Sequence, residues 1–485
     1  VNRNSAKAYV ADGVSINAKG DVDVTVHSSQ NTTGYFPAYM SAQAIAASIA
    51  TGMNGTLGLA GAVAVLSAYA DSIAQIGNNV SITAGGDILV EAIDFGKLAI
   101  RALGANIGRQ TLGVGAAAAM LYAGSNIHAL IGDDFTAVAN SLTVNAQRPL
   151  VDESLYQFPF DWSDLLTINS AVNNPTNPEK GLFDITLPEQ LNQITQIRIE
   201  CTIGTDDVMD IFDMINYLAM VNYYVEAISG SLNTSAQTAA NLAGTLAALF
   251  AGNSVRAEIG DNASLSLNKN DEGDGLSVTA DSAATTRIIA GGVSIGAPKA
   301  SVGAAVSLAD ISDQVSASIG DVTDGSKISS TGNMKVSANA DNEMWNVTVA
   351  DSSAIGGQNA LTIGGGVNLV KSSTQALARV GNGVDVTSQG DFSVNGDNHN
   401  ESAIIAVSVG FATGNTNVAA GGTVAYGEFA NQTGARLGDG AKVDAKSLSL
   451  TADSSEKLMH ILASASGALQ NTIGAAATVA VFDNS

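Results

Sequence analysis

Alternation of apolar and polar residues is the dominant pattern of this chain, and it returns in seven copies of one motif. In the clearest copy, Ala74–Ala92, a small residue precedes an aliphatic–glycine pair, an Asp or Asn, and two alternating segments, Val80–Ala84 and Asp87–Ala92. The other copies begin at Ala8, Ala129, Ala257, Ala317, Ala378 and Ala435. A period of two residues predicts short strands with one buried face and one face in water.

The segments that precede each motif are richer in small and apolar residues, as in Gly61–Leu66, Gly303–Leu308 and Gly364–Leu369. Near-continuous apolar strands are expected where a sheet is covered on both sides. A helix is the alternative, because alanine is the best helix former. The interleaved glycine, valine and threonine residues disfavour a helix by up to about 1 kcal/mol each. We therefore predict strands here as well.

The glycine of the aliphatic–glycine pair marks the register of the repeat. Gly77 is followed by Gly132, and Gly320 is followed by Gly381, so the period is roughly 60 residues. Such a period is too long for one coil of a slim β-helix. It fits either two or three stacked coils, or one wide, flattened coil with an extra layer. The predicted fold class is all-β, a repetitive parallel β-solenoid (β-helix) with an inserted α-helix and loop element.

One interval breaks the period, because the step from Gly132 to Gly260 is about twice as long as the others. The repeat stops after Ala146 and resumes near Ala236, so three regions are expected: solenoid repeats over 1–146, an insertion over 147–235, and solenoid repeats over 236–485. Five of the seven prolines lie in the insertion. A composition shift of this kind indicates an inserted element.

Within the insertion, the pattern predicts a helix that begins at Thr205 as N-cap and ends at Gly230. A shorter helix is predicted from Pro188 to about Ile194. The aromatic segment Ser154–Ser163 is interpreted as an ordered loop.

Aromatic and acidic residues of the insertion are the candidate partner-binding surface. Tyrosine and tryptophan dominate interfaces because they bury a large area at little entropic cost. The alternative is that these rings pack back onto the solenoid. The candidate residues are Tyr156, Phe158, Phe160, Trp162, Asp210, Asp213, Tyr217 and Tyr224. The expected partner is a host protein, for instance an immunoglobulin or a cell-surface receptor.

Composition narrows the partners further. The chain is 46% apolar but only 5% aromatic, which indicates closely packed layers of small side chains. Its 45 acidic and 21 basic residues give a net charge of −24, which argues against nucleic acid and against docking on anionic membranes. The single cysteine and four scattered histidines show no metal-ligand spacing, so no metal or cofactor is expected. No apolar run approaches the roughly 18 residues of a membrane span.

Two features could suggest an enzyme. The Asp or Asn after the register glycine could form an acidic ladder that binds calcium or cleaves polysaccharide, but a turn residue bonded to its own backbone is favoured. With two or three coils per repeat, successive copies would lie about 10–15 Å apart. Gly292–Gly296 matches the Gly-x-Ser-x-Gly pattern of a nucleophile elbow, yet it lies inside an alternating strand. We therefore predict a non-catalytic protein.

The repeats at Ala74–Ala92, Ala378–Val394 and Ala435–Ala452 resemble those of giant bacterial filamentous adhesins. They are most similar to the fusobacterial leukotoxin-type filamentous adhesins and more distantly to filamentous haemagglutinins. The resemblance implies a secreted or surface-displayed β-solenoid that contacts host cells or proteins, and it implies no catalytic residues. Both ends of the chain have the same repeat phase, so flanking repeats of a longer chain are expected. The alternatives are a polysaccharide-degrading β-helix, an immunoglobulin-binding, superantigen-like module and a pure spacer.

Overall fold

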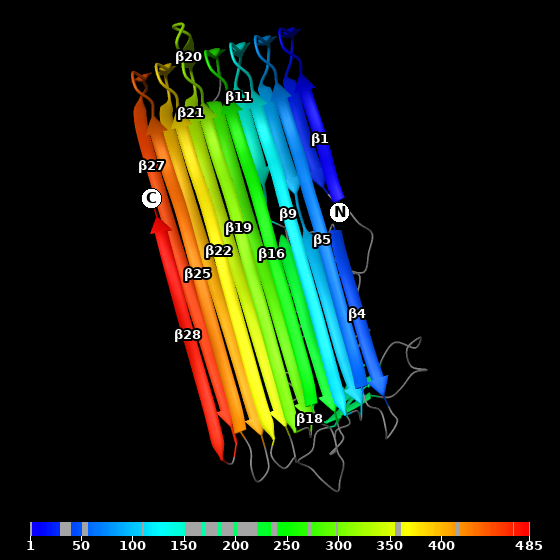
Figure 1. Ribbon diagram of the computed structural model, residues 1–485. Helices are drawn as coiled ribbons and strands as arrows, with labels where there is room; N and C mark the ends of the chain where they lie inside the picture. Colours follow the sequence, from blue (N-terminus) through cyan, green and yellow to red (C-terminus); the bar gives the residue numbers. More distant parts are fainter. Residues whose placement is uncertain are drawn as a thin grey trace.

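Parallel strands make up nearly all of the computed structural model (Figure 1). It describes residues 2–29, 40–50, 57–108, 111–150, 167–170, 182–186, 197–200, 221–233, 240–269, 273–296, 299–354, 360–412, 418–468 and 470–484. The described residues contain no helix, and their long strands form three stacked parallel sheets. The predicted all-β, parallel β-solenoid is therefore confirmed.

Sheet A has eight strands, and six of them are 20 residues long. In spatial order they are β1 (Asn2–Val10), β5 (Leu57–Ile76), β9 (Leu112–Ile131), β16 (Ala240–Ile259), β19 (Ala300–Ile319), β22 (Leu361–Val380), β25 (Val418–Leu437) and β28 (Asn471–Asn484).

Sheet B consists of seven short strands, which correspond to the first alternating segment of the motif. They are β2 (Ser15–Ala18), β6 (Ser81–Ala84), β10 (Thr136–Ala139), β17 (Ser264–Leu267), β20 (Lys327–Ser330), β23 (Asp385–Ser388) and β26 (Lys442–Asp444).

Sheet C begins with the second alternating segment of the motif and continues into the apolar segment that follows. Four coils have one long strand here: β18 (Asp274–Gly296), β21 (Asn333–Ala354), β24 (Asp391–Ala412) and β27 (Ser447–Gly467). In the other coils the strand is divided into β3 (Val22–Ser29) and β4 (Met40–Ala50), β7 (Ile88–Phe95) and β8 (Leu98–Gly108), and β11 (Leu142–Arg148) and β15 (Tyr223–Asn233).

Each repeat forms one coil. Every residue of β19 pairs in register with β16 on one side and with β22 on the other. Of the two possibilities that the period left open, the single wide coil is therefore correct, and two or three stacked coils per repeat are wrong. A 20-residue strand is about 66 Å long, and eight strands at about 4.8 Å spacing extend about 34 Å.

Two hydrophobic cores fill the coil. The first lies where the three sheets meet and contains Ile76, Ile82 and Val90 in one coil. The second lies between sheets A and C and consists largely of alanines with residues such as Ile100 and Leu121. Small side chains let the two sheets pack closely in this half of the molecule.

The insertion interrupts a single strand of sheet C. β11 pairs with Leu276–Ser282 of β18, and β15 pairs with Thr286–Gly296 of the same strand. The solenoid therefore continues to Arg148 and resumes by Tyr223. The insertion is shorter than the expected 147–235. Within it, β12 (Thr167–Ser170), β13 (Leu182–Thr186) and β14 (Ile197–Glu200) form an antiparallel sheet.

The predicted end of the long helix at Gly230 is wrong. Gly230 lies inside β15, where β8 and β18 pair with the backbone on both sides. The local signal for a helix end at Gly230 was overridden by these two ladders. The rest of that prediction (205–220), the short helix at 188–194 and the loop at 154–163 lie outside the described residues.

The turn between sheets A and B explains the register glycine. A Cβ on Gly320 would lie 2.6 Å from the carbonyl carbon of Gly260 in the neighbouring coil. Two residues after the register glycine, most copies have positive φ, for example 57° at Asn262 and 69° at Gly383; Val322, after Gly320, is the exception. The motif is therefore a glycine that permits close stacking, followed by Asp or Asn and then a residue that tolerates the left-handed region.

Candidate binding surface

Most of the predicted partner-binding residues lie outside the described part of the chain. They are Tyr156, Phe158, Phe160, Trp162, Asp210, Asp213 and Tyr217, and their role stays a prediction. Tyr224 is described, and the expectation that it is exposed on a helix is wrong. It lies on β15 with only 3% of its surface exposed. Its hydroxyl donates a hydrogen bond of 2.6 Å to Glu226.

Tyr224 belongs to a buried charged cluster on sheet C. Arg101 on β8 forms an ion pair with Glu226 on β15, and both side chains are almost fully buried. Burial is the largest single influence on Arg101 and disfavours its charge, but Glu226 and Tyr224 together outweigh burial and raise the pKa of the guanidinium. Burial, followed by the nearby carboxylate, holds the pKa of Tyr224 well above its ordinary value. The cluster joins two strands and has no exposed polar group to offer a partner.

The Asp and Asn residues of the turn form a hydrogen-bonded ladder between coils, which we call the Asx ladder. Asn78 Oδ1 accepts from the backbone amide of Asp133 at 2.8 Å, and Asp133 Oδ1 accepts from that of Asp261 at 2.9 Å. The remaining rungs are Asp12 to Asn78, Asp261 to Asp321, Asp321 to Asn382, and Asn382 to Asp439. The wide spacing expected between successive copies is wrong, because each repeat is a single coil.

The prediction that these side chains bond their own backbone is also wrong. The side chains bond the backbone of the next coil instead of their own. Asp and Asn alternate without loss of the bond, so the oxygen acceptor matters and the negative charge does not. In the part of the chain that the structure describes, no three or more His, Cys, Asp or Glu residues are grouped to hold a metal ion.

The Gly-x-Ser-x-Gly match has a structural place. Ser294 lies within β18, is fully buried, and its Oγ is 2.7 Å from that of Ser301. As expected from the sequence, it is inside a strand and not at a strand-to-helix turn.

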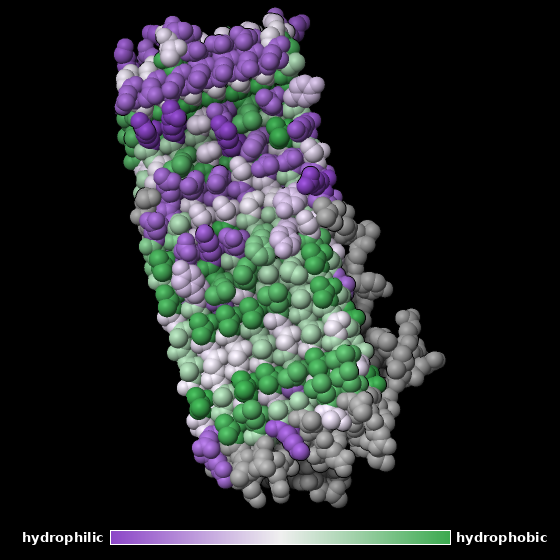
Figure 2. Space-filling model, viewed as in Figure 1, coloured by the Kyte–Doolittle hydropathy of each residue, from purple (hydrophilic) through white to green (hydrophobic). Residues whose placement is uncertain are grey.

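The outer face of sheet A carries an extended apolar surface. We call it the apolar field and define it by the outward-facing residues of 57–65, 112–120, 240–248, 300–308, 361–369, 418–426 and 471–479. None of these residues is charged, and Tyr426 and Asn471 are the only ones with a polar group. Figure 2 shows the field as green rows across the lower part of the molecule.

On these strands the larger side chains face outward and the smaller ones face inward. On β22 the outward residues include Leu361, Ile363 and Leu369, and each of them is exposed. The inward residues between them include Thr362 and Asn368, which are buried. Large aliphatic groups therefore point into water, whereas small and polar groups point into the protein. The sequence interpretation, in which both faces of these strands are covered, is wrong for this face of sheet A.

The apolar field is large for a free surface. Five rows along each strand and seven strands across give about 26 Å by 29 Å. Exposure is 40% for Leu361 and Ile363 on β22, and it rises to 59% for Leu59 and 65% for Val63 at the edge of the sheet. The largest apolar patch of a typical monomer is about 300–600 Å², and larger patches mark interaction sites. The area of the field is therefore comparable with one side of an ordinary protein–protein interface, about 800 Å².

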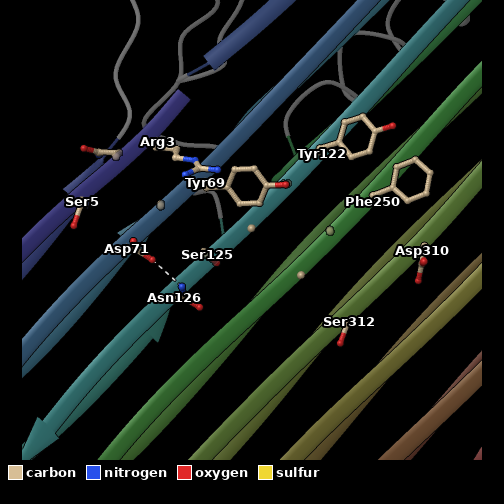
Figure 3. Close-up of a pocket in the computed structure, with 16 residues that line it drawn as sticks. Arg3, Ser5, Tyr69, Asp71, Tyr122, Ser125, Asn126, Phe250, Asp310 and Ser312 are labelled. Atoms are coloured by element: carbon tan, nitrogen blue, oxygen red, sulfur yellow. Dashed lines mark hydrogen bonds between the residues drawn. The ribbon is translucent and has the colours of Figure 1, made fainter. Parts of the chain in front are cut away.

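A hollow of about 690 Å³ borders the apolar field on the same face (Figure 3). We call it the aromatic hollow. It crosses β1, β5, β9, β16 and β19, and its outward-facing lining is Arg3, Ser5, Tyr69, Asp71, Tyr122, Gly124, Asn126, Phe250, Gly252, Asp310 and Ser312. These residues could not be recognised as a site in the sequence, because they lie on five successive coils and only the coil register brings them together.

Comparison of the chain with protein families, curated proteins and solved structures finds no match. The described residues include no helix that is long and apolar enough to cross a membrane.

Proposed function

We propose that this chain is a non-catalytic binding segment of a secreted or surface-displayed bacterial β-solenoid of the filamentous adhesin type. It contacts a host protein or cell surface through the apolar field of sheet A. Its activity is recognition, and it needs no cofactor.

The observation that carries this proposal is the outward orientation of the large aliphatic residues. Leaving Leu361 and Ile363 40% exposed forgoes part of the roughly 1.5–3 kcal/mol that full burial of each side chain would contribute. Interchanging the two faces of the strand would bury these groups and cost the fold nothing in β propensity. A partner that covers the field provides the burial that the fold itself does not. A pure spacer would have no use for this surface.

A polysaccharide-degrading β-helix is the rival function. It would need carboxylates free to act on a substrate, whereas each rung oxygen of the Asx ladder already accepts a backbone hydrogen bond. An immunoglobulin-binding module is a narrower form of the proposal, since an immunoglobulin is one possible host protein. The net charge of −24 disfavours anionic partners such as nucleic acid.

Paired variants on the same strands test the proposal. Val306→Glu with Val367→Glu places two charges within the apolar field, on β19 and β22. The matched control, Gln314→Glu with Gln375→Glu, adds the same charges to the outer face of the same strands, outside the field. The labelled proteins are titrated onto cultured mammalian epithelial cells and, separately, onto immobilised immunoglobulin G.

We expect saturable binding by the unmodified chain and by the glutamine-site control. The valine-site variant should bind about thirtyfold more weakly, because desolvating two carboxylates in an apolar interface is costly. Equal binding by both variants would contradict the proposed surface. Release of sugar products from a neutral or acidic polysaccharide panel would instead favour the enzyme.

A further inference from the structure

The aromatic hollow is separate from the apolar field and differs from it in chemistry. Its floor is backbone, because glycines occupy two neighbouring strands at the same level. A Cβ on Gly252 would meet no atom within 4 Å, so this part of the floor is open. A Cβ on Gly124 would lie 2.7 Å from Cδ1 of Tyr69, so that ring lies close over the strand. The hollow therefore depends on these small residues.

Three aromatic residues, Tyr69, Tyr122 and Phe250, line the hollow (Figure 3). The rings of Tyr122 and Phe250 are nearly parallel, at 9°, with centroids 5.0 Å apart. Tyr69 is 42% exposed, and the Arg3 guanidinium lies 6.0 Å from the centre of its ring. Because Tyr122 and Phe250 stack on each other, a ligand meets the outer faces and edges of this pair and the exposed part of Tyr69. This arrangement does not enclose a cation as an aromatic cage does.

Polar groups surround the rings. Asp71 accepts a hydrogen bond of 2.7 Å from Asn126 Nδ2, which leaves further acceptor positions on the carboxylate and a donor and an acceptor on the amide. Asp310 and Ser312 line the side formed by β19. A purely apolar ligand would bury these groups without partners, at a cost in free energy. The ligand must therefore combine apolar faces with many hydroxyl groups.

We propose that the aromatic hollow binds an uncharged oligosaccharide. A pyranose ring has an apolar face of C–H groups that stacks on an aromatic ring and an equatorial belt of hydroxyls that pair with carboxylate and amide groups. The volume of about 690 Å³ lies within the roughly 300–1,000 Å³ of typical ligand sites.

Charge selects the class of sugar. Two carboxylates, Asp71 and Asp310, and one cation, Arg3, line the hollow, and the whole chain carries a net charge of −24. This negative charge repels uronic acid and sialic acid polymers, whereas it does not repel a neutral hexose chain. Recognition of a neutral glycan here needs no contact with the apolar field, so it goes beyond the proposed protein partner.

Isothermal titration of the purified chain with maltohexaose, cellohexaose and mannohexaose tests the site. At least one of these sugars should bind saturably, and hexagalacturonate should bind about tenfold more weakly or not at all. Tyr122→Ala with Phe250→Ala should weaken binding about tenfold to thirtyfold, as for aromatic residues at the centre of an interface. Asp71→Asn should weaken it with the stacking rings unchanged.

Two controls keep the outcome clear. Tyr9→Ala removes an exposed tyrosine that lies outside the hollow and should retain binding. Circular dichroism must show strand content like that of the unmodified chain; if the double alanine variant does not fold, Asp71→Asn alone decides, and unchanged affinity in it overturns the proposal. The proposal is overturned if none of the three neutral hexaoses binds. Unchanged affinity in both Asp71→Asn and the folded double variant would also overturn it.

Discussion

At the scale of single residues, the Asx ladder shows how one oxygen atom fixes the stacking of coils. We expect Asp261→Ala to lower the free energy of unfolding by about 1 kcal/mol, because the backbone amide of Asp321 loses its acceptor. Asp261→Asn is the control and should be close to neutral, since Asn78 and Asn382 already serve as rungs. Urea denaturation measures both. A similar loss in the two variants would indicate that charge, not hydrogen bonding, is the property required.

A second residue predicts a pH dependence of stability. Asp94 on β7 is buried, which raises the pKa of its carboxyl to about 6, although the nearby Arg148 opposes the shift. Between about pH 4 and 6 the folded state therefore holds a proton that the unfolded state has released. Stability falls as pH rises through this window, by up to about 3 kcal/mol.

Asp94→Asn should remove this contribution. Relative to the unmodified chain, the variant should gain stability as pH rises from 4 to 7, because the amide cannot ionise. Urea denaturation at a series of pH values measures the difference between the two proteins, so other titrating groups cancel. Parallel pH profiles of the two proteins would show that Asp94 titrates normally in the folded state.

At the scale of elements, the register glycine determines how closely the turns stack. Gly320→Ala places a Cβ within 2.6 Å of the Gly260 backbone, so we expect a loss of several kcal/mol or failure to fold. Gly244→Ala meets no atom within 4 Å, lies within a strand, and should be neutral or slightly stabilising. Thermal unfolding of both variants measures the contrast. Equal effects would mean that the turns are not stacked in this register.

The strands could be predicted from the sequence because their signal is local. The alternation in Val80–Ala84 gives strand β6, and the glycine and valine content of Gly303–Leu308 disfavours a helix. The side of β22 that faces solvent could not be predicted, because Leu361 and Thr362 give the same alternation in either orientation. The aromatic hollow was missed for a related reason. Tyr69, Tyr122 and Phe250 become neighbours only through pairing between coils.

At the scale of the whole molecule, sheet A exposes large aliphatic groups on its outer face. We expect the folded chain to bind the dye 8-anilinonaphthalene-1-sulfonate, which reports exposed apolar surface, without loss of strand content. Val306→Glu with Val367→Glu should reduce the fluorescence, and Gln314→Glu with Gln375→Glu should not. A folded chain that does not enhance the dye's fluorescence would show that the apolar field is covered in solution.

The central claim is that binding resides on sheet A of the solenoid and not in the inserted segment. A variant without the insertion can be designed from the fourth coil. There, three residues, 283–285, join the parts of β18 that pair with β11 and β15. Replacing residues 149–222 by Ala-Ala-Thr should therefore close the third coil with its strands intact.

The affinity of this trimmed chain is measured for the cells or immunoglobulin that the full chain binds. We expect the affinity of the trimmed chain to lie within about threefold of that of the full chain, since the apolar field is unchanged. Loss of binding by a trimmed chain with native strand content would contradict it and assign recognition to the insertion.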